Sequence, residues 1–220
     1  MAKVFLSPSN QYDNVYAYGN TTEGVQCGKI AEACNVALER SGVDVMLMHD
    51  ESMQTKCAES NKFGADLHVP IHTNAFNGSV MGTRMFCYNT GKGMAACKAI
   101  FARVAPLSPG TSENIQVNQK LYEVRVPAAP TAYIECEFHD TVDGAKWIVE
   151  NTAAIGEAIA RGICDYFGVA FKEPEQPKPA AGATIYRVQV GAYTKKENAE
   201  NMLAKLKKDG YSGFIVEGKL

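Results

Sequence analysis

The sequence predicts an α/β fold: a mainly parallel sheet flanked by helices on both faces, followed by a small C-terminal βαβ unit. Through about residue 170, short apolar segments alternate with helical segments of ten or more residues, the length that a parallel crossover requires. A proline-rich stretch then interrupts this pattern, and one further strand–helix–strand pattern follows it. We therefore divide the chain into a first domain at 1–170, a linker at 171–183 and a C-terminal unit at 184–220.

The first domain alternates between strand and helix signals. The strand-like regions are 3–9, 43–49, 65–75, 82–90 and 121–140, the last holding two short extended pieces. The helical segments are 21–42, 53–64, 91–107 and 141–169. In the first of these helices, Ile30, Cys34 and Leu38 recur at helical spacing and Gly42 ends the pattern.

The C-terminal unit carries its own signals. Residues 184–193 alternate like a half-buried strand, Thr194 and Glu197 form a capping box at the start of an amphipathic helix, and 211–218 resemble another strand. A unit of about 37 residues is small for a stable core of its own. It therefore needs a partner, or its second half is missing.

Composition and charge exclude several classes of protein. A net charge of −2 gives no general attraction to nucleic acid or anionic membranes, and no apolar run approaches the roughly 18 residues of a membrane span. The N-terminus lacks the apolar region of a signal peptide, so we expect synthesis in the cytoplasm. The seven cysteines are odd in number and contain no CxxC pair, which favours reduced structural thiols over a disulfide scaffold or zinc finger.

Candidate site residues lie where predicted strands end, because sites in parallel sheets form beyond the carboxyl ends of the strands. This rule selects Ser7–Asp13, His72–Ala75 and Glu135–Asp140. In the second segment, His72 and Asn74 share one face of the strand. A structural histidine and a metal ligand are both open interpretations of His72 from pattern alone.

His68 lies deeper in the same strand, and we expect a hydrogen-bonded core histidine there. Near the end of the last strand, alternation places Glu135, Glu137 and His139 on one face. Burying two glutamates is costly unless they pair with a cation or bind metal, so this is the strongest functional signal from pattern alone. Glu23 opens the first long helix, where a partner for the helix dipole is the plain interpretation.

Three motifs occur in this order along the chain: "TTEGVQCGKIA", "PIHTN" and "RVPAAPTAYIECEF". Together, over about residues 3–168, they resemble the zinc-dependent N-acetylmuramoyl-L-alanine amidases of bacterial autolysins and phage endolysins. That family has Asp-Pro-Gly-His after the first strand, a Glu opening the first helix, Ser-Ile-His-x-Asn, and then an Arg, a Pro and a strand ending Glu-x-Gly-Phe. The matching residues here are Glu23, His72, Asn74, Arg125, Pro130, Glu135 and Phe138.

One motif departs from the family pattern. "LSPSNQ" stands in place of Asp-Pro-Gly-His, so Asn10 occupies the position of the first metal ligand, although an amide is a poor ligand for zinc. Three alternatives follow: Asp13 folds back and donates its carboxylate, Asn10 or Gln11 holds a water in a weaker site, or the ligand is absent. Ligand chemistry ranks Asp13 first, whereas the alignment register favours Asn10.

The resemblance implies hydrolysis of the amide between N-acetylmuramic acid and the L-Ala of the stem peptide. Zn²⁺ would be held by Glu23, His72 and a third ligand from the first loop. Glu135 would act as general base and then general acid. Arg125 would anchor an acidic group of the substrate, and Asn74 would orient the substrate or His72.

The C-terminal "YRVQVGAYTKKENAENMLAKLKKDGY" resembles the first half of a SPOR domain, a module that binds peptidoglycan strands stripped of their peptides. Bacterial cell-wall peptidoglycan is therefore the expected partner of both units, with no nucleic-acid or membrane partner. A homodimer through the half module is one way to complete it. The protein would act on the wall after release, as a phage lysin or an autolysin. The alternative function is a degenerate, non-catalytic peptidoglycan-binding protein.

Overall fold

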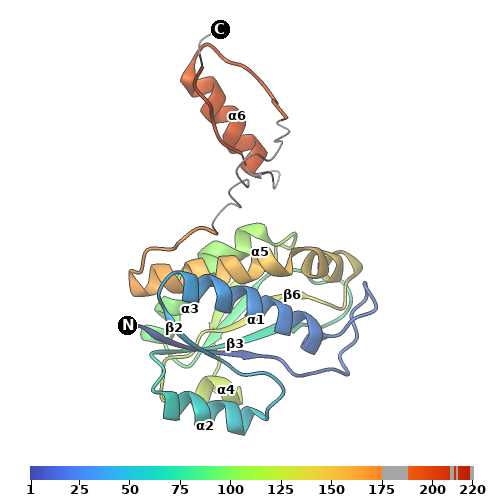
Figure 1. The fold of residues 1–220 in the computed structure, drawn as a ribbon. Helices are drawn as coiled ribbons and strands as arrows, with labels where there is room; N and C mark the ends of the chain where they lie inside the picture. The colour runs from blue at the N-terminus through green and yellow to red at the C-terminus, as the bar shows by residue number, and fades with distance from the viewer. Residues whose placement is uncertain (175–187, 209–210, 212, 219–220) are drawn as a thin grey trace, which may run out of the picture. The chain divides into compact units, whose positions relative to one another are not determined.

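The computed structural model describes most of the chain: residues 1–174, 188–208, 211 and 213–218. The chain divides into two compact units, Met1–Pro174 and Glu175–Leu220. The first unit contains the sheet, and the described part of the second contains the helix Lys196–Lys208 (Figure 1). Of the linker predicted at 171–183, positions 175–183 lie outside the described residues.

Six strands form a single sheet in the order β2-β1-β3-β6-β4-β5. They are β1 (Lys3–Pro8), β2 (Asp44–Leu47), β3 (Leu67–Asn74), β4 (Arg84–Cys87), β5 (Asn114–Val117) and β6 (Tyr133–Phe138). Every neighbouring pair is parallel except β4 with β6, which is antiparallel. The predicted mainly parallel α/β sheet is confirmed.

Helices cover both faces of this sheet. They are α1 (Glu23–Arg40), α2 (Met53–Phe63), α3 (Lys92–Val104), the 3₁₀ turn η1 (Ala105–Leu107), α4 (Tyr122–Arg125) and α5 (Val142–Phe167). Helices α1, α3 and α5 lie on one face, and α2 and α4 lie on the other (Figure 1). A Cβ atom at Gly156 of α5 would lie 2.5 Å from the carbonyl oxygen of Ile30, so α1 and α5 pack closely only because this residue is glycine.

Alternation along the strands separates an apolar face from a polar one. The buried apolar core beneath α1, α3 and α5 includes one set of alternating strand residues: Val4, Leu6, Val69, Ile71, Ile134 and Cys136. The side chains between them point to the face covered by α2 and α4. By this alternation the second face carries Ser7, His68, His72 and Glu135, so the shorter helices cover the sheet's polar groups.

Two elements differ from the sequence-based expectation. The first of the two pieces predicted to be extended within 121–140 is instead the single helical turn α4. Strand β5 was not predicted, because four half-exposed residues are too few to show an alternating pattern.

The helix predicted in the C-terminal unit is present as α6 (Lys196–Lys208). The flanking segments 188–193 and 213–218 form no strand, and positions 184–187 lie outside the described residues. Two strands without further neighbours are marginal in water, which gives a physical reason for this difference.

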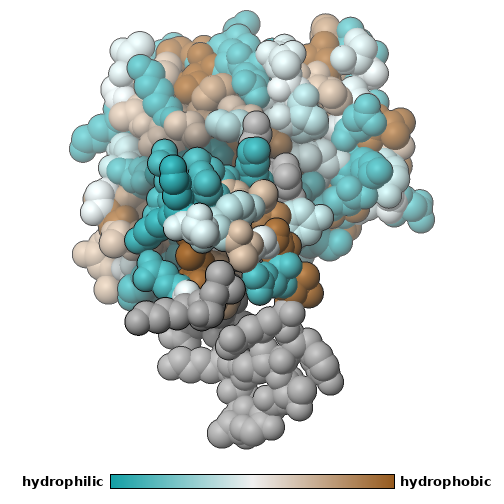
Figure 2. Space-filling model, turned by 90° about the horizontal axis from the view of Figure 1, so that it is seen from above, coloured by the Kyte–Doolittle hydropathy of each residue, from teal (hydrophilic) through white to brown (hydrophobic). Residues whose placement is uncertain are grey.

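No helix in the described ranges is both long and apolar enough to cross a bilayer. The face drawn in Figure 2 mixes hydrophilic and hydrophobic residues, and its hydrophobic residues are scattered in small groups. Scattered apolar residues of this kind are normal for a protein surface.

Candidate active site

Three acidic or imidazole side chains meet near the carboxyl ends of β1, β3 and β6. Glu23 is the first residue of α1, His72 lies near the end of β3, and Glu135 lies in β6. The register of the sheet places His72 directly beside Glu135 on the neighbouring strand. This is the end of a parallel sheet at which sites are expected.

Glu23 and His72 are in direct contact. The Nδ1 atom of His72 lies 2.9 Å from Oε1 of Glu23, and the two residues are only 8% and 1% exposed. The ring of Tyr133 stacks on the imidazole with 4.6 Å between ring centroids. His72 is therefore held on its ring face and at one nitrogen.

The carboxylate of Glu23 also accepts two amide hydrogen bonds from the first loop. Asn14 donates to Oε2 at 2.7 Å, and Gln11 donates to Oε1 at 3.3 Å. Burial by itself raises the pKa of Glu23, but the hydrogen bonds from His72 and Asn14 outweigh it and hold the pKa below its usual value. Glu23 is thus an ionised carboxylate at neutral pH.

The pKa of Glu135 is shifted in the opposite direction from that of Glu23. Burial of its carboxyl group raises its pKa to about 7, the positive charge of His72 opposes this rise, and the negative charge of Glu23 adds to it. The residue as a whole is partly exposed, although its Oε2 atom is buried. A carboxyl group with a pKa near 7 exchanges protons readily at physiological pH.

Two polar atoms of this cluster have no partner among the residues that the structure describes. Within the described part of the chain, His72 Nε2 and Glu135 Oε2 are buried and make no hydrogen bond. Leaving a buried polar atom unpaired costs about 1–3 kcal/mol, so such atoms usually meet a ligand, ion or water. The arrangement is that of a site prepared for a bound group.

A third acidic residue of this cluster, Glu123, was not predicted from the sequence. It lies in α4, is 3% exposed and accepts a hydrogen bond from the Ser7 hydroxyl at 2.5 Å. Its Oε1 lies 3.4 Å from Nε2 of His68, and its Oε2 lies 3.9 Å from Nε2 of His72. Extended structure was expected for the first piece of 121–140, which includes Glu123, so this residue was not considered for the site. A glutamate between apolar neighbours was a signal that could have found it.

Burial raises the pKa of Glu123, but its contacts with His68, His72 and Ser7 hold it well below its usual range. His68 is fully buried, its Nδ1 lies 3.0 Å from the Ser60 hydroxyl, and its ring stacks on Phe5. It is the hydrogen-bonded core histidine expected from the sequence.

A profile of the amidase type 3 family, described as N-acetylmuramoyl-L-alanine amidase, matches residues 11–165. The chain belongs to this family. Its members are peptidoglycan amidases that hydrolyse the N-acetylmuramoyl-L-alanine bond and are generally zinc-dependent. A second profile, that of the SPOR domain, matches residues 166–217, which indicates peptidoglycan binding.

Two curated amidases are similar over nearly the whole chain. The sporulation-specific N-acetylmuramoyl-L-alanine amidase of Bacillus subtilis strain 168 is 24% identical over 224 residues, covering 98% of this chain and 85% of that protein. N-acetylmuramoyl-L-alanine amidase CwlM of Bacillus licheniformis is 23% identical over 227 residues, with the same two coverages.

Solved amidase structures share the fold of the first unit. The catalytic domain of the amidase CwlV from Bacillus (Paenibacillus) polymyxa var. colistinus matches with a TM-score of 0.69 at 16% identity, covering 77% of this chain and 100% of that chain. The amidase AmiC2 of Nostoc punctiforme matches with a TM-score of 0.64 at 20% identity, covering 76% and 97%.

In the structure of this amidase, Asn10 and Asp13 lie in the first loop and are not buried together with the Glu23–His72 pair. Both are exposed, and the side chain of Asn10 donates to the backbone oxygen of Glu51 at 3.0 Å. Among the described residues, Asp13 belongs to no close group of three His, Cys, Asp or Glu ligand atoms. The family match begins at residue 11, immediately after the position where the family has its first histidine.

The two proposed substrate-binding residues lie on different elements. Arg125 is exposed at the end of α4, the turn that carries Glu123. Asn74 is half-buried at the end of β3, and its Oδ1 accepts a hydrogen bond from the backbone of Ala75.

The predicted grouping of Glu137 and His139 with Glu135 is wrong. The register of β3 and β6 shifts between His72 and Asn74, which breaks the alternation. Glu137 accepts hydrogen bonds from the backbone of Gly82 and Phe138, and His139 contacts Thr73 at 2.9 Å. Both therefore have structural partners of their own.

Among the described residues, one close group with a metal-binding composition does occur. The ligand atoms of Cys57, His68 and Glu123 lie within 4.8 Å of one another. His68 and Glu123 already use Ser60 and Ser7 as hydrogen-bond partners, so internal hydrogen bonds account for this group. All seven cysteines are free and buried.

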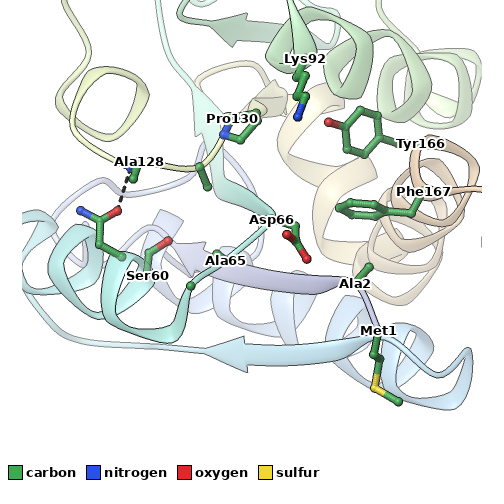
Figure 3. A pocket seen from close by; sticks show the side chains of 13 residues that line it. Met1, Ala2, Ser60, Ala65, Asp66, Lys92, Ala128, Pro130, Tyr166 and Phe167 are labelled. Atoms are coloured by element: carbon green, nitrogen blue, oxygen red, sulfur yellow. Dashed lines mark hydrogen bonds between the residues drawn. The ribbon is translucent and has the colours of Figure 1, made fainter.

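A cavity of about 770 Å³ lies at the other end of the strands. Its lining includes Ala2 and Asp66, which directly precede β1 and β3, together with Lys92, Pro130 and Tyr166 (Figure 3). The candidate active site is at the carboxyl ends of the same strands. The cavity is therefore separate from the amidase chemistry.

Proposed function

We propose that this amidase cleaves the amide between the lactyl group of N-acetylmuramic acid and the L-Ala of the stem peptide, with a zinc ion held by Glu23 and His72. The observation that carries the proposal is the buried contact between His72 Nδ1 and Glu23 Oε1, beside Glu135, whose Oε2 is buried and has no hydrogen-bond partner in the described part of the chain. A carboxylate and an imidazole are both ligand types that zinc accepts, and these two lie side by side with 2.9 Å between Oε1 and Nδ1.

The third ligand in this proposal comes from the loop at 9–14. Asp13 is the first choice because a carboxylate is a good zinc ligand, and its exposed position requires the loop to fold inward. Asn10 is the second choice, because it occupies the motif position at which the family has its first metal ligand. Gln11 already contacts Glu23, which makes its amide a candidate to hold a water.

Glu135 is the general base and general acid of the proposed reaction. When bound, zinc polarises the scissile carbonyl and makes water more acidic. Glu135 takes the proton from the attacking water and passes it to the nitrogen of the leaving L-Ala amine. A pKa of about 7 suits both steps, since the group must be unprotonated for the first and protonated for the second.

Arg125 and Asn74 are proposed to bind the substrate. A guanidinium is suited to carboxylate recognition, and the exposed Arg125 is free to turn toward an acidic oxygen of the lactyl group or stem peptide. Asn74 follows His72 by two residues and is proposed to orient the substrate or that imidazole.

The C-terminal unit is proposed to hold glycan strands from which the peptide has been removed, which is the product of the first unit's reaction. The protein would then act on the wall after release from the cell in which it is made. Pairing of two chains through the half module remains a proposal that sedimentation of the full chain would test.

Zinc analysis and a wall-digestion assay test the proposed chemistry. We expect the purified protein to bind about one zinc and to release stem peptides from isolated walls, with activity lost in chelator and restored by zinc. Full activity in a preparation free of bound metal would overturn the metal mechanism.

A second candidate function is wall binding without cleavage, and Asn10 in place of the first ligand favours it. Under this alternative the protein would sediment with wall sacs and release no peptide, with or without added zinc. The Glu135 carboxyl group, with its pKa of about 7 next to His72, favours the enzyme.

A further inference from the structure

We propose that Glu123 is the positioning residue for His72: its carboxylate accepts the Nε2–H of the imidazole and thereby keeps Nδ1 directed at Glu23 and the metal. This inference rests on the proposed zinc function. It adds a residue from α4 to a site otherwise built from α1, β3 and β6.

The geometry behind the proposal is that His72 lies between two carboxylates. Its Nδ1 lies 2.9 Å from Glu23, and its Nε2 lies 3.9 Å from Oε2 of Glu123. The Nε2 atom is buried and has no hydrogen-bond partner in the described part of the chain. Glu123 is the carboxylate that faces this unpaired nitrogen within ion-pair range.

The separation of 3.9 Å is longer than a hydrogen bond. Contacts of this kind are often long in the unloaded form of an enzyme and shorten when the ligand is in place. Binding of a metal at Nδ1 would leave one proton on the ring, at Nε2, and that proton needs an acceptor. Glu123 is placed to accept it.

Glu123 is itself fixed on its far side. Ser7 donates to Oε1 at 2.5 Å, and Nε2 of His68 lies 3.4 Å from the same atom. His68 is in turn held by Ser60 at 3.0 Å. The two oxygens of Glu123 thus have separate tasks, since Oε1 anchors the side chain and Oε2 is directed at His72.

The general chemistry of metal sites supports a role for Glu123 as the partner of His72. An imidazole that binds a metal usually donates its other N–H to a carboxylate or carbonyl, which sets the ring orientation and raises its basicity. Removing such a partner typically costs about 10- to 100-fold in metal affinity. A carboxylate that is 3% exposed is also costly to bury unless it has partners of this kind.

The first experiment measures zinc affinity by competition with a chromophoric chelator, on the full chain and on three variants. We expect Glu123→Ala to weaken zinc binding about 10- to 100-fold. Glu123→Gln keeps an oxygen that can accept the Nε2–H, so we expect a smaller loss, of less than about tenfold. Glu137→Gln is the matched control, because Glu137 is also buried but is bonded to backbone amides of Gly82 and Phe138.

The second experiment distinguishes positioning from a purely structural role. In zinc-loaded protein with ¹⁵N-labelled histidine, we expect a protected Nε2–H signal from His72. The signal should shift in Glu123→Gln and remain unchanged in Glu137→Gln. This readout also serves if Glu123→Ala fails to fold.

The outcomes separate this inference from the proposed function. A wild-type chain that binds no zinc would overturn the proposed function itself. A wild-type chain that binds zinc, together with a folded Glu123→Gln variant whose affinity and Nε2–H signal match the wild type, would overturn the role of Glu123 alone.

Discussion

His72 Nδ1 and Glu23 Oε1 lie 2.9 Å apart although the two residues are 49 positions apart in the sequence. The contact joins the end of a central strand to the first turn of the helix that crosses over it. Because both groups are buried and ionisable, they are stable together only when a proton or a metal ion lies between them. Each prediction below changes one part of the arrangement around this contact or of the fold that supports it.

Glu135→Gln should lower the rate of stem-peptide release by about 10²- to 10⁴-fold, the usual contribution of a general acid–base group. An amide of the same shape cannot take up the proton, whereas zinc content and thermal unfolding should stay close to wild type. The exposed Glu150→Gln on α5 is the control and should keep full activity. Retained activity in Glu135→Gln would remove this residue from the mechanism.

The stability of the metal-free protein should depend on pH through Glu135 and His72. Burial and the charge of Glu23 raise the pKa of Glu135 from 4.5 to about 7. Burial lowers the pKa of His72, but the nearby carboxylates of Glu123 and Glu23 outweigh this effect and raise it from 6.5 to about 9. Both pKa values are raised on folding, so each contribution is complete below the unfolded pKa and is lost as pH rises through the folded pKa.

Denaturant unfolding of chelator-treated protein from pH 4.5 to 9 measures this effect. Glu135→Gln lacks the contribution of Glu135, so its stability relative to wild type should increase between about pH 4.5 and 7 and then level off. A difference between the two proteins that stays constant over this range would contradict the raised pKa of Glu135.

Loop variants should identify the third metal ligand. Asp13→Ala should lose bound zinc, because Asp13 is the best ligand by type in the loop, and Asn10→Ala should keep most of it. Metal analysis after dialysis against a weak chelator measures both variants. Loss of zinc in Asn10→Ala alone would reverse this ranking.

Gly156→Ala should destabilise the first unit by about 1–3 kcal/mol. The added Cβ would lie 2.5 Å from the carbonyl oxygen of Ile30 and 2.7 Å from Cβ of Ala33, so α1 and α5 would have to separate. Gly28→Ala in α1 is the matched control. Its new Cβ would meet only His49 at 3.6 Å, and we expect a gain of about 0.5–1 kcal/mol from helix propensity. Chemical denaturation compares the two, and equal stabilities would contradict the close packing.

Removal of the chain after Pro174 should weaken binding to glycan strands without peptides and leave hydrolysis of short soluble muramyl peptides unchanged. The first unit is compact by itself and contains the whole candidate site, whereas the SPOR match extends through the removed part. Sedimentation with stripped wall sacs measures the first effect. Undiminished sedimentation of the shortened chain would place wall binding in the first unit.

Local patterns in the sequence were enough to predict much of this protein. Helical spacing and strand–helix alternation predicted the parallel α/β sheet, because parallel strands require long crossovers. The motifs around Glu23, His72 and Glu135 predicted the amidase family, which the profile match confirmed. These signals are local, and each is complete within about ten to twenty residues.

Only the tertiary structure decided which distant groups meet. It joined Glu23 to His72, brought Glu123 from a single helical turn to the same imidazole, and gave Glu137 and His139 other partners through a register shift in the sheet. Alternation and spacing specify the face of an element on which a side chain lies. The distance between two faces depends on how helices and strands pack together, and that packing is set by contacts between residues far apart in the chain.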